Sequence, residues 1–96
     1  MKLNSSKFKP GDHVYVVKPL SQDLIEGYIM FENIGGYMIR TVNQITHNAE
    51  RFHWSDSNNH FFSQTEGNRI DCSENFIIPY GKAAEVLYMS RGGRIL

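Results

Sequence analysis

The stretch Phe8-Lys-Pro-Gly-Asp-His-Val-Tyr-Val-Val17 decides the fold of this chain. Pro10 fixes its own backbone φ angle and Gly11 accepts φ values that other residues avoid, so the pair predicts a turn. The residues after the turn alternate between two faces: Val14 and Val16 on one, and His13, Tyr15 and Val17 on the other. Alternating β-branched and aromatic residues are typical of a β-strand. The sequence therefore predicts a strand over 12–18 with apolar side chains on both faces.

The next strands follow from the same alternation. Residues 24–31 predict a second strand, whose first face carries Ile25, Gly27, Ile29 and Phe31. A glycine inside a strand often marks a bulge or a tight bend. A turn over 32–36 and a strand over 37–42 complete a hairpin within 24–45.

Two further β segments are predicted in the second half of the chain. Residues 51–54 and 60–63 flank the polar run Ser55-Asp-Ser-Asn-Asn59, and together they predict a second hairpin. A turn is expected over 66–69. Residues 75–80 predict a short final strand that ends at Pro79.

The C-terminal segment allows two interpretations. Lys82-Ala-Ala-Glu85 are good helix formers, which favours a helix over 81–90 with Val86, Leu87 and Met89 docked on the sheet and Gly92 as its end. The run 86–89 is also compatible with a strand. Ile95 and Leu96 form an apolar tail that is expected to pack against the rest of the chain.

Short strands separated by turns every 8–12 residues or so indicate a small barrel or sandwich. The opening, with Phe8, Gly11, Asp12 and Val14, resembles that of SH3-like barrels, including KOW and Tudor-type domains. Gly27-Tyr-Ile29 and Glu74-Asn-Phe-Ile-Ile-Pro79 are similar to later strands of such barrels. A KOW motif would place a glycine and basic residues after the first strand, where this chain has Pro19-Leu-Ser-Gln-Asp23.

The resemblance implies a mainly β fold: a small SH3-like barrel of about five strands with an inserted hairpin and a short C-terminal helix. In this scheme residues 1–9 are a flexible lead-in, residues 10–80 form the barrel, and residues 44–69 are the inserted hairpin. Residues 81–96 form the helix and tail. Inserted segments often carry function, which directs attention to 44–69.

Composition narrows the class of protein. The 96 residues suit one domain, and their formal net charge is zero. Residues 1–20 and 81–96 have an excess of basic side chains while 21–80 have an excess of acidic ones, so overall charge argues against extensive phosphate binding. The single cysteine, Cys72, excludes an intramolecular disulfide and fits a reducing compartment. No signal peptide or membrane span is visible, and a cytoplasmic location without membrane contact is expected.

Neither a metal site nor a catalytic site is predicted. His47, His53 and His60 are the residues nearest to a metal-ligand pattern, but their spacing matches no common zinc motif. Cys72 has the acidic neighbours Asp71 and Glu74, which would raise the pKa of its thiol and suppress its nucleophilicity. We expect Cys72 to be a buried core residue, and we expect no enzymatic activity and no cofactor.

The function that the sequence favours is binding of a protein partner by a non-enzymatic accessory, regulatory or inhibitory module. The surface would combine the predicted hairpin over 51–62, with Trp54 as its exposed anchor, and the tail. Its predicted residues are Phe52, Trp54, Phe61, Phe62, Arg91 and Arg94. Aromatic grooves of SH3-like barrels bind peptides, which is what the resemblance implies here.

Three alternatives stay open at this point. The basic termini and strand aromatics are compatible with nucleic-acid binding. A metal-dependent enzyme would need the three histidines to converge. Homo-oligomerisation would give the apolar pair Ile95 and Leu96 a place to pack.

Overall fold

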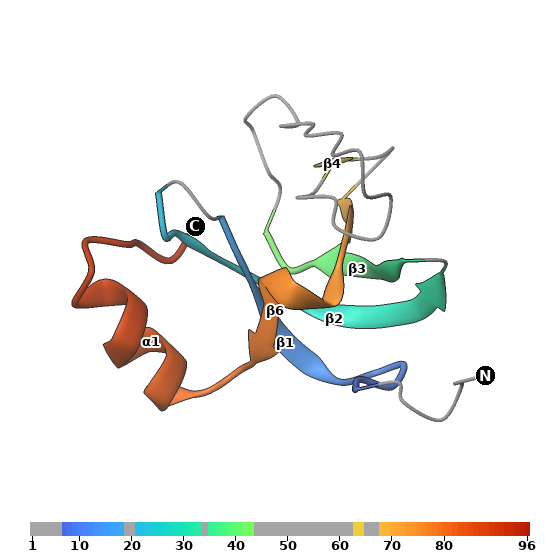
Figure 1. Cartoon of the computed structure of the whole chain (residues 1–96), viewed down its shortest axis with the longest axis horizontal. Coiled ribbons are helices and arrows are strands. Elements are labelled where there is room, and N and C mark those ends of the chain that lie inside the picture. Colours follow the sequence, from blue (N-terminus) through green and yellow to red (C-terminus); the bar gives the residue numbers. More distant parts are fainter. Residues whose placement is uncertain (1–6, 19–20, 34, 44–62, 65–67) are drawn as a thin grey trace.

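Strand β1 (His13–Val17) confirms the strand predicted from the opening stretch, and the computed structural model builds an antiparallel sheet around it (Figure 1). β2 (Leu24–Asn33) pairs with one side of β1 and β6 (Ile77–Pro79) with the other. β3 (Gly36–Thr41), β5 (Arg69–Cys72) and β4 (Ser63–Gln64) extend the sheet, giving the order β4-β5-β3-β2-β1-β6. The structure describes residues 7–18, 21–33, 35–43, 63–64 and 68–96.

One face of the sheet, here called the inner face, carries the main core. β1 contributes Val14 and Val16, and both are fully buried. The other buried members are Phe8, which precedes β1, and residues of β2, β3, β5 and β6, because β-strands place alternate side chains on the same face. They are Phe8, Ile25, Ile29, Tyr37, Ile39, Ile70, Cys72 and Ile77.

The opposite face, here called the outer face, is covered at one end by helix α1 (Lys82–Met89). Tyr15, Val17 and Leu24 are buried there against Ala84 and Tyr88 of the helix. The two-sided packing expected of β1 is therefore confirmed, and so is the helix. The helix ends at Met89, and Gly92, predicted as its stop, follows three residues later with a φ of 91°, a left-handed value that glycine adopts without strain.

The face of α1 that docks differs from the prediction. Ala84 and Tyr88, four residues apart, face the sheet, whereas Val86, Leu87 and Met89 are exposed. Tyr15 explains the choice, because its hydroxyl donates a 2.6 Å hydrogen bond to Glu85 and so fixes the rotation of the helix. The prediction counted apolar residues and missed this polar contact.

The strand predicted over 24–31 continues to Asn33 and contains a bulge that reverses its alternation. Ile29 pairs with Ile39, but Phe31 pairs with Met38, so Met30 is an extra residue. One extra residue in a strand moves every later side chain to the other face. Phe31, expected in phase with Ile29, is consequently exposed.

Gly27 has a different role from the predicted bulge. It lies on the inner face opposite Thr41, where a Cβ atom would stand 2.6 Å from Cγ2 of Ile39 and 2.7 Å from the carbonyl oxygen of Arg40. The missing side chain allows β2 and β3 to approach each other.

Both ends of the described chain are fixed to the sheet. Phe8, within the segment predicted as a flexible lead-in, belongs to the core, and the turn after it is closed by hydrogen bonds between Lys9 and Asp12. At the other end Leu96 packs against the same core, as expected of the tail. Its amide donates to the carbonyl of Leu24, and Figure 1 shows the C-terminus beside the start of β2.

The second half of the sheet differs from the prediction in two strands. The short β5 was not predicted, because it has only four residues, Arg-Ile-Asp-Cys, and the first of them, Arg69, belongs to the turn expected over 66–69. The final strand is shorter than expected, since a 3-10 turn occupies Glu74–Phe76 before β6 begins. The predicted hairpin at 51–62 lies outside the described residues.

Candidate functional site: the outer face of the sheet

A stack of three aromatic rings stands on the outer face beside α1. The ring of His13 on β1 lies between the rings of Tyr28 on β2 and Tyr80, which follows β6. The centroid separations are 4.3 Å and 3.7 Å, and the ring planes are within 10° of parallel. Tyr28 and Tyr80 are each 42% exposed, so the stack forms part of the surface. Since it gives two large exposed rings defined positions, it is a candidate recognition surface.

Hydrogen bonds to two glutamates hold this stack and the helix in place. His13 donates from Nε2 to a carboxylate oxygen of Glu26 at 2.7 Å, so the imidazole is fixed at its edge as well as on both faces. Tyr15, one position further along the same face, donates to Glu85 of α1. Burial, together with this bond to a carboxylate, raises the pKa of the Tyr15 phenol. Tyr15 therefore remains a neutral donor that joins helix and sheet.

The pairing register continues the stack into a row of five side chains. His13 is opposite Tyr28, Tyr28 is opposite Arg40 on β3, and Arg40 is opposite Arg69 on β5. The amide of Tyr80 bonds to the carbonyl of His13 and completes the row at its other end. Residues directly opposite in antiparallel strands project from the same face. The result is a cross-strand row, Tyr80-His13-Tyr28-Arg40-Arg69, with rings at one end and guanidinium groups at the other.

A second exposed surface is the outward side of α1. Val86, Leu87 and Met89 are 61%, 46% and 53% exposed, respectively. They lie within one turn of the helix, and Ser90 closes it by bonding to the carbonyl of Leu87. Large apolar side chains grouped at the surface commonly mark a protein contact.

The two arginines predicted to bind a partner both lie after α1. Arg91 is within 5.1 Å of the Tyr88 ring, and Nη1 is 3.4 Å from Oε1 of Gln22. Arg94 anchors the tail, because its amide bonds to Oδ1 of the buried Asp23 and its guanidinium is 3.7 Å from Oδ2. The Arg94 backbone thus anchors the tail, while its side chain is 75% exposed, and Arg91 is also on the exposed surface.

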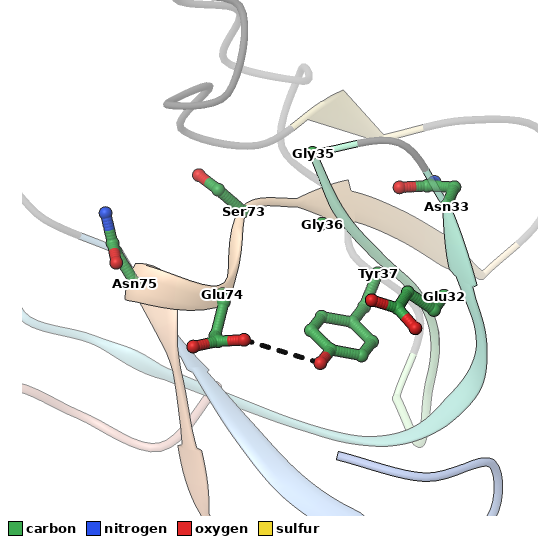
Figure 2. Close-up of a pocket in the computed structure, with 8 residues that line it drawn as sticks. All are labelled: Glu32, Asn33, Gly35, Gly36, Tyr37, Ser73, Glu74 and Asn75. Atoms are coloured by element: carbon green, nitrogen blue, oxygen red, sulfur yellow. Dashed lines mark hydrogen bonds between the residues drawn. The ribbon is translucent and has the colours of Figure 1, made fainter. Parts of the chain in front are cut away.

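Beside the hairpin turn of β2 and β3 there is a half-open cleft of about 250 Å³ (Figure 2). The Tyr37 hydroxyl, at its floor, accepts hydrogen bonds from the amides of Lys7 and Phe8 and donates to Glu74. The side chain of Asn33 at the rim donates to Asp71 at 2.9 Å. These polar groups fasten the N-terminal segment and the 3-10 turn to the hairpin, which accounts for the cleft as a structural junction. The described residues that line it are Glu32, Asn33, Gly35, Gly36, Tyr37, Ser73, Glu74 and Asn75.

On the outer face, His13 and Glu26 form a histidine–carboxylate pair. A carboxylate can orient the imidazole of a histidine, but nucleophilic catalysis also needs an activated hydroxyl or thiol within reach of that imidazole. Cys72 is fully buried on the opposite face, as predicted, and burial followed by the charge of Asp71 raises its pKa. Among these residues no three His, Cys, Asp or Glu side chains converge as metal ligands.

Most of the residues predicted for the site lie outside the described part of the chain. They are Phe52, Trp54, Phe61 and Phe62 of the predicted hairpin, and the histidines His47, His53 and His60. The cross-strand row was not predicted as a site, although the alternation of His13 and Tyr15 already placed both on the second face of their strand. What the sequence lacked was the strand pairing, because it does not show which residues of the neighbouring strands lie opposite His13 and Tyr28.

Helix α1 has only eight residues, and over the described ranges no helix has both the length and the apolar character that a membrane crossing requires. Comparisons of this chain with protein-family models, with curated proteins and with solved structures found no match.

Proposed function

We propose that this chain is a non-enzymatic interaction module that binds a protein partner through the outward side of α1. The observation that carries the proposal is the exposure of Val86, Leu87 and Met89 on a helix whose opposite side packs against the sheet. Burying three such side chains in a complex would contribute several kcal/mol, at about 25 cal/mol per Å² of apolar area removed from water. Arg91, directly after the helix, would lie at the polar rim of the contact.

We also propose that the fold is a variant of the SH3-like barrel. The support comes from the order of elements: the first strand pairs with the last, and a 3-10 turn connects β5 to β6. In such a barrel the predicted hairpin at 51–62 would be an insertion between β3 and β5 and would add Trp54 to the partner surface. Accessory or regulatory action in the cytoplasm, and association of two copies, remain part of this proposal.

The test is a pull-down from native extract with a double variant, Val86→Ser and Leu87→Ser. We expect the wild-type chain to retain a protein partner, with or without nuclease, and the double variant to lose it. Ala83→Ser is the matched control, because Ala83 is exposed on the same helix but is not part of the apolar group. Size-exclusion chromatography of the purified wild type and double variant shows whether the partner is a second copy.

Two results would refute protein binding through α1. One is retention of the partner by the double variant at the wild-type level, with both chains folded by circular dichroism. The other is loss of every captured protein when nuclease is added, because nucleic acid would then be the bridging ligand.

A further inference from the structure

The two ends of the cross-strand row differ in chemistry: one end is aromatic and the other is cationic. Its first three members are a continuous aromatic stack, and its last two are guanidinium groups. Arg40 is exposed and lies directly opposite Arg69, a like-charged arrangement that disfavours strand pairing. A phosphate bound at the exposed Arg40 would add a favourable charge interaction at this position.

We propose that this row is a binding site for single-stranded nucleic acid, separate from the protein-binding surface on α1. A single strand offers both kinds of group that the row matches: flat bases for the rings and phosphates for the guanidinium groups. Tyr28 is the junction of the two. His13 covers one face of its ring, and within the described part of the chain no other ring stacks on it.

The charges beside the row determine where a strand can lie. Glu26 is in the neighbouring row on one side, and Asp71 is in the neighbouring row on the other. Both carboxylates repel phosphate, so they would confine a bound strand to the row and exclude a wider duplex footprint. Each carboxylate is already hydrogen-bonded, Glu26 to His13 and Asp71 to Asn33.

An acidic peptide is the competing occupant. It would use the arginine end but would have no flat group for Tyr28, and it would leave the stack unoccupied. The contiguity of rings and guanidinium groups in one row therefore favours nucleic acid. With at most two phosphates neutralised, we expect weak, sequence-tolerant binding that falls with salt at a log–log slope of about −1.4.

The experiment is fluorescence anisotropy of a labelled oligothymidylate of about 12 nucleotides, a length within the site sizes of small β domains. Tyr28→Ala should weaken binding roughly tenfold or more, since base stacking on one aromatic ring accounts for that much. Arg40→Gln should weaken binding and make the salt slope shallower by about 0.7. Arg91→Gln, a matched loss of one exposed arginine outside the row, should leave both affinity and slope unchanged.

Several outcomes would overturn the proposal. They are absence of binding at low salt, loss of binding in Arg91→Gln but not in Arg40→Gln, and wild-type affinity in both Arg40→Gln and Tyr28→Ala. Equal competition by a polyglutamate peptide of the same charge would make the row an acidic-peptide site instead. Tyr28→Leu keeps an apolar side chain on the strand, so it separates loss of the ring from loss of folding. Because the variants of Tyr28 and Arg40 leave both α1 and Arg91 unchanged, their result is independent of the pull-down.

Discussion

At the scale of single residues, Gly27 is the position where one added methyl group should matter most. A Cβ atom there would stand 2.7 Å from the Arg40 carbonyl oxygen, and this backbone atom cannot move without disturbing the β2–β3 pairing. We expect Gly27→Ala to lower the free energy of unfolding by about 1–3 kcal/mol, the usual cost of overpacking. Urea denaturation measures this. Val42→Ala, at an exposed site beyond β3, should stay within about 0.5 kcal/mol, and equal stability of the two variants would contradict the close approach.

His13 marks how far residue-level prediction could reach. The alternation in 12–18 correctly placed it on the second face of its strand together with Tyr15. Its neighbours were not predictable, because Tyr80 is brought beside it by pairing between the first and last strands. The sequence predicts which face a strand residue occupies far better than it predicts the long-range partner.

At the scale of elements, the errors come from places where one contact overrides a pattern. The extra residue Met30 reverses the phase of β2, and the ladder with β3 reveals it where the composition does not. In α1 the periodicity allowed two docking faces, and the bond from Tyr15 to Glu85 together with the packing of Tyr88 selected one. Element type was thus predictable, whereas the orientation of each element depended on tertiary contacts.

The contact between the tail and the start of β2 depends on Asp23, and it should be sensitive to pH. Burial by itself would raise the pKa of this carboxyl. Hydrogen bonds from the Arg94 amide and from Ser21, together with the Arg94 charge, outweigh burial and lower the pKa below its ordinary value. A carboxyl with a lowered pKa in the folded state stabilises the fold above its unfolded value of about 3.9, and this stabilisation is lost as pH falls through the folded pKa.

We therefore expect Asp23→Asn to be less stable than wild type at pH 7, by about 1–3 kcal/mol, because it loses a charged, buried hydrogen-bond acceptor. The difference in stability should shrink below about pH 4, since the Asp23 carboxyl of the wild type then becomes protonated and is neutral, like the amide that replaces it. Urea midpoints across this range give the measurement. Arg94→Gln removes the exposed charge but keeps the amide donor, so it should cost less than Asp23→Asn. A difference that stays constant down to pH 2 or so would mean that Asp23 does not titrate with folding.

At the scale of the whole molecule, the sequence predicted the class and the outline of the fold. A mainly β chain, the first strand, the first hairpin, a C-terminal helix and a packed tail are all confirmed. The strand order was beyond reach, because β5 is only four residues long and β6 pairs with β1 from the far end of the chain. Both pairings depend on long-range closure, for which the local sequence has no signal.

The tail should contribute to the stability of the whole sheet rather than only to its own order. Leu24 donates its amide to the Arg94 carbonyl and accepts from the Leu96 amide, each at 2.8 Å, while the Leu96 side chain packs on the inner core. Removing residues 93–96 loses these bonds, the Asp23 contact and the Leu96 packing together. We expect a loss of about 3 kcal/mol, which for a domain of this size lowers the melting temperature by roughly 10–20 °C. Leu96→Ala should reproduce part of this loss, and Ile95→Ala, whose side chain is 43% exposed, very little. If the shortened chain melts at the wild-type temperature, and the Leu24 amide exchanges with solvent no faster, the tail is a passive end and the sheet is stable without it.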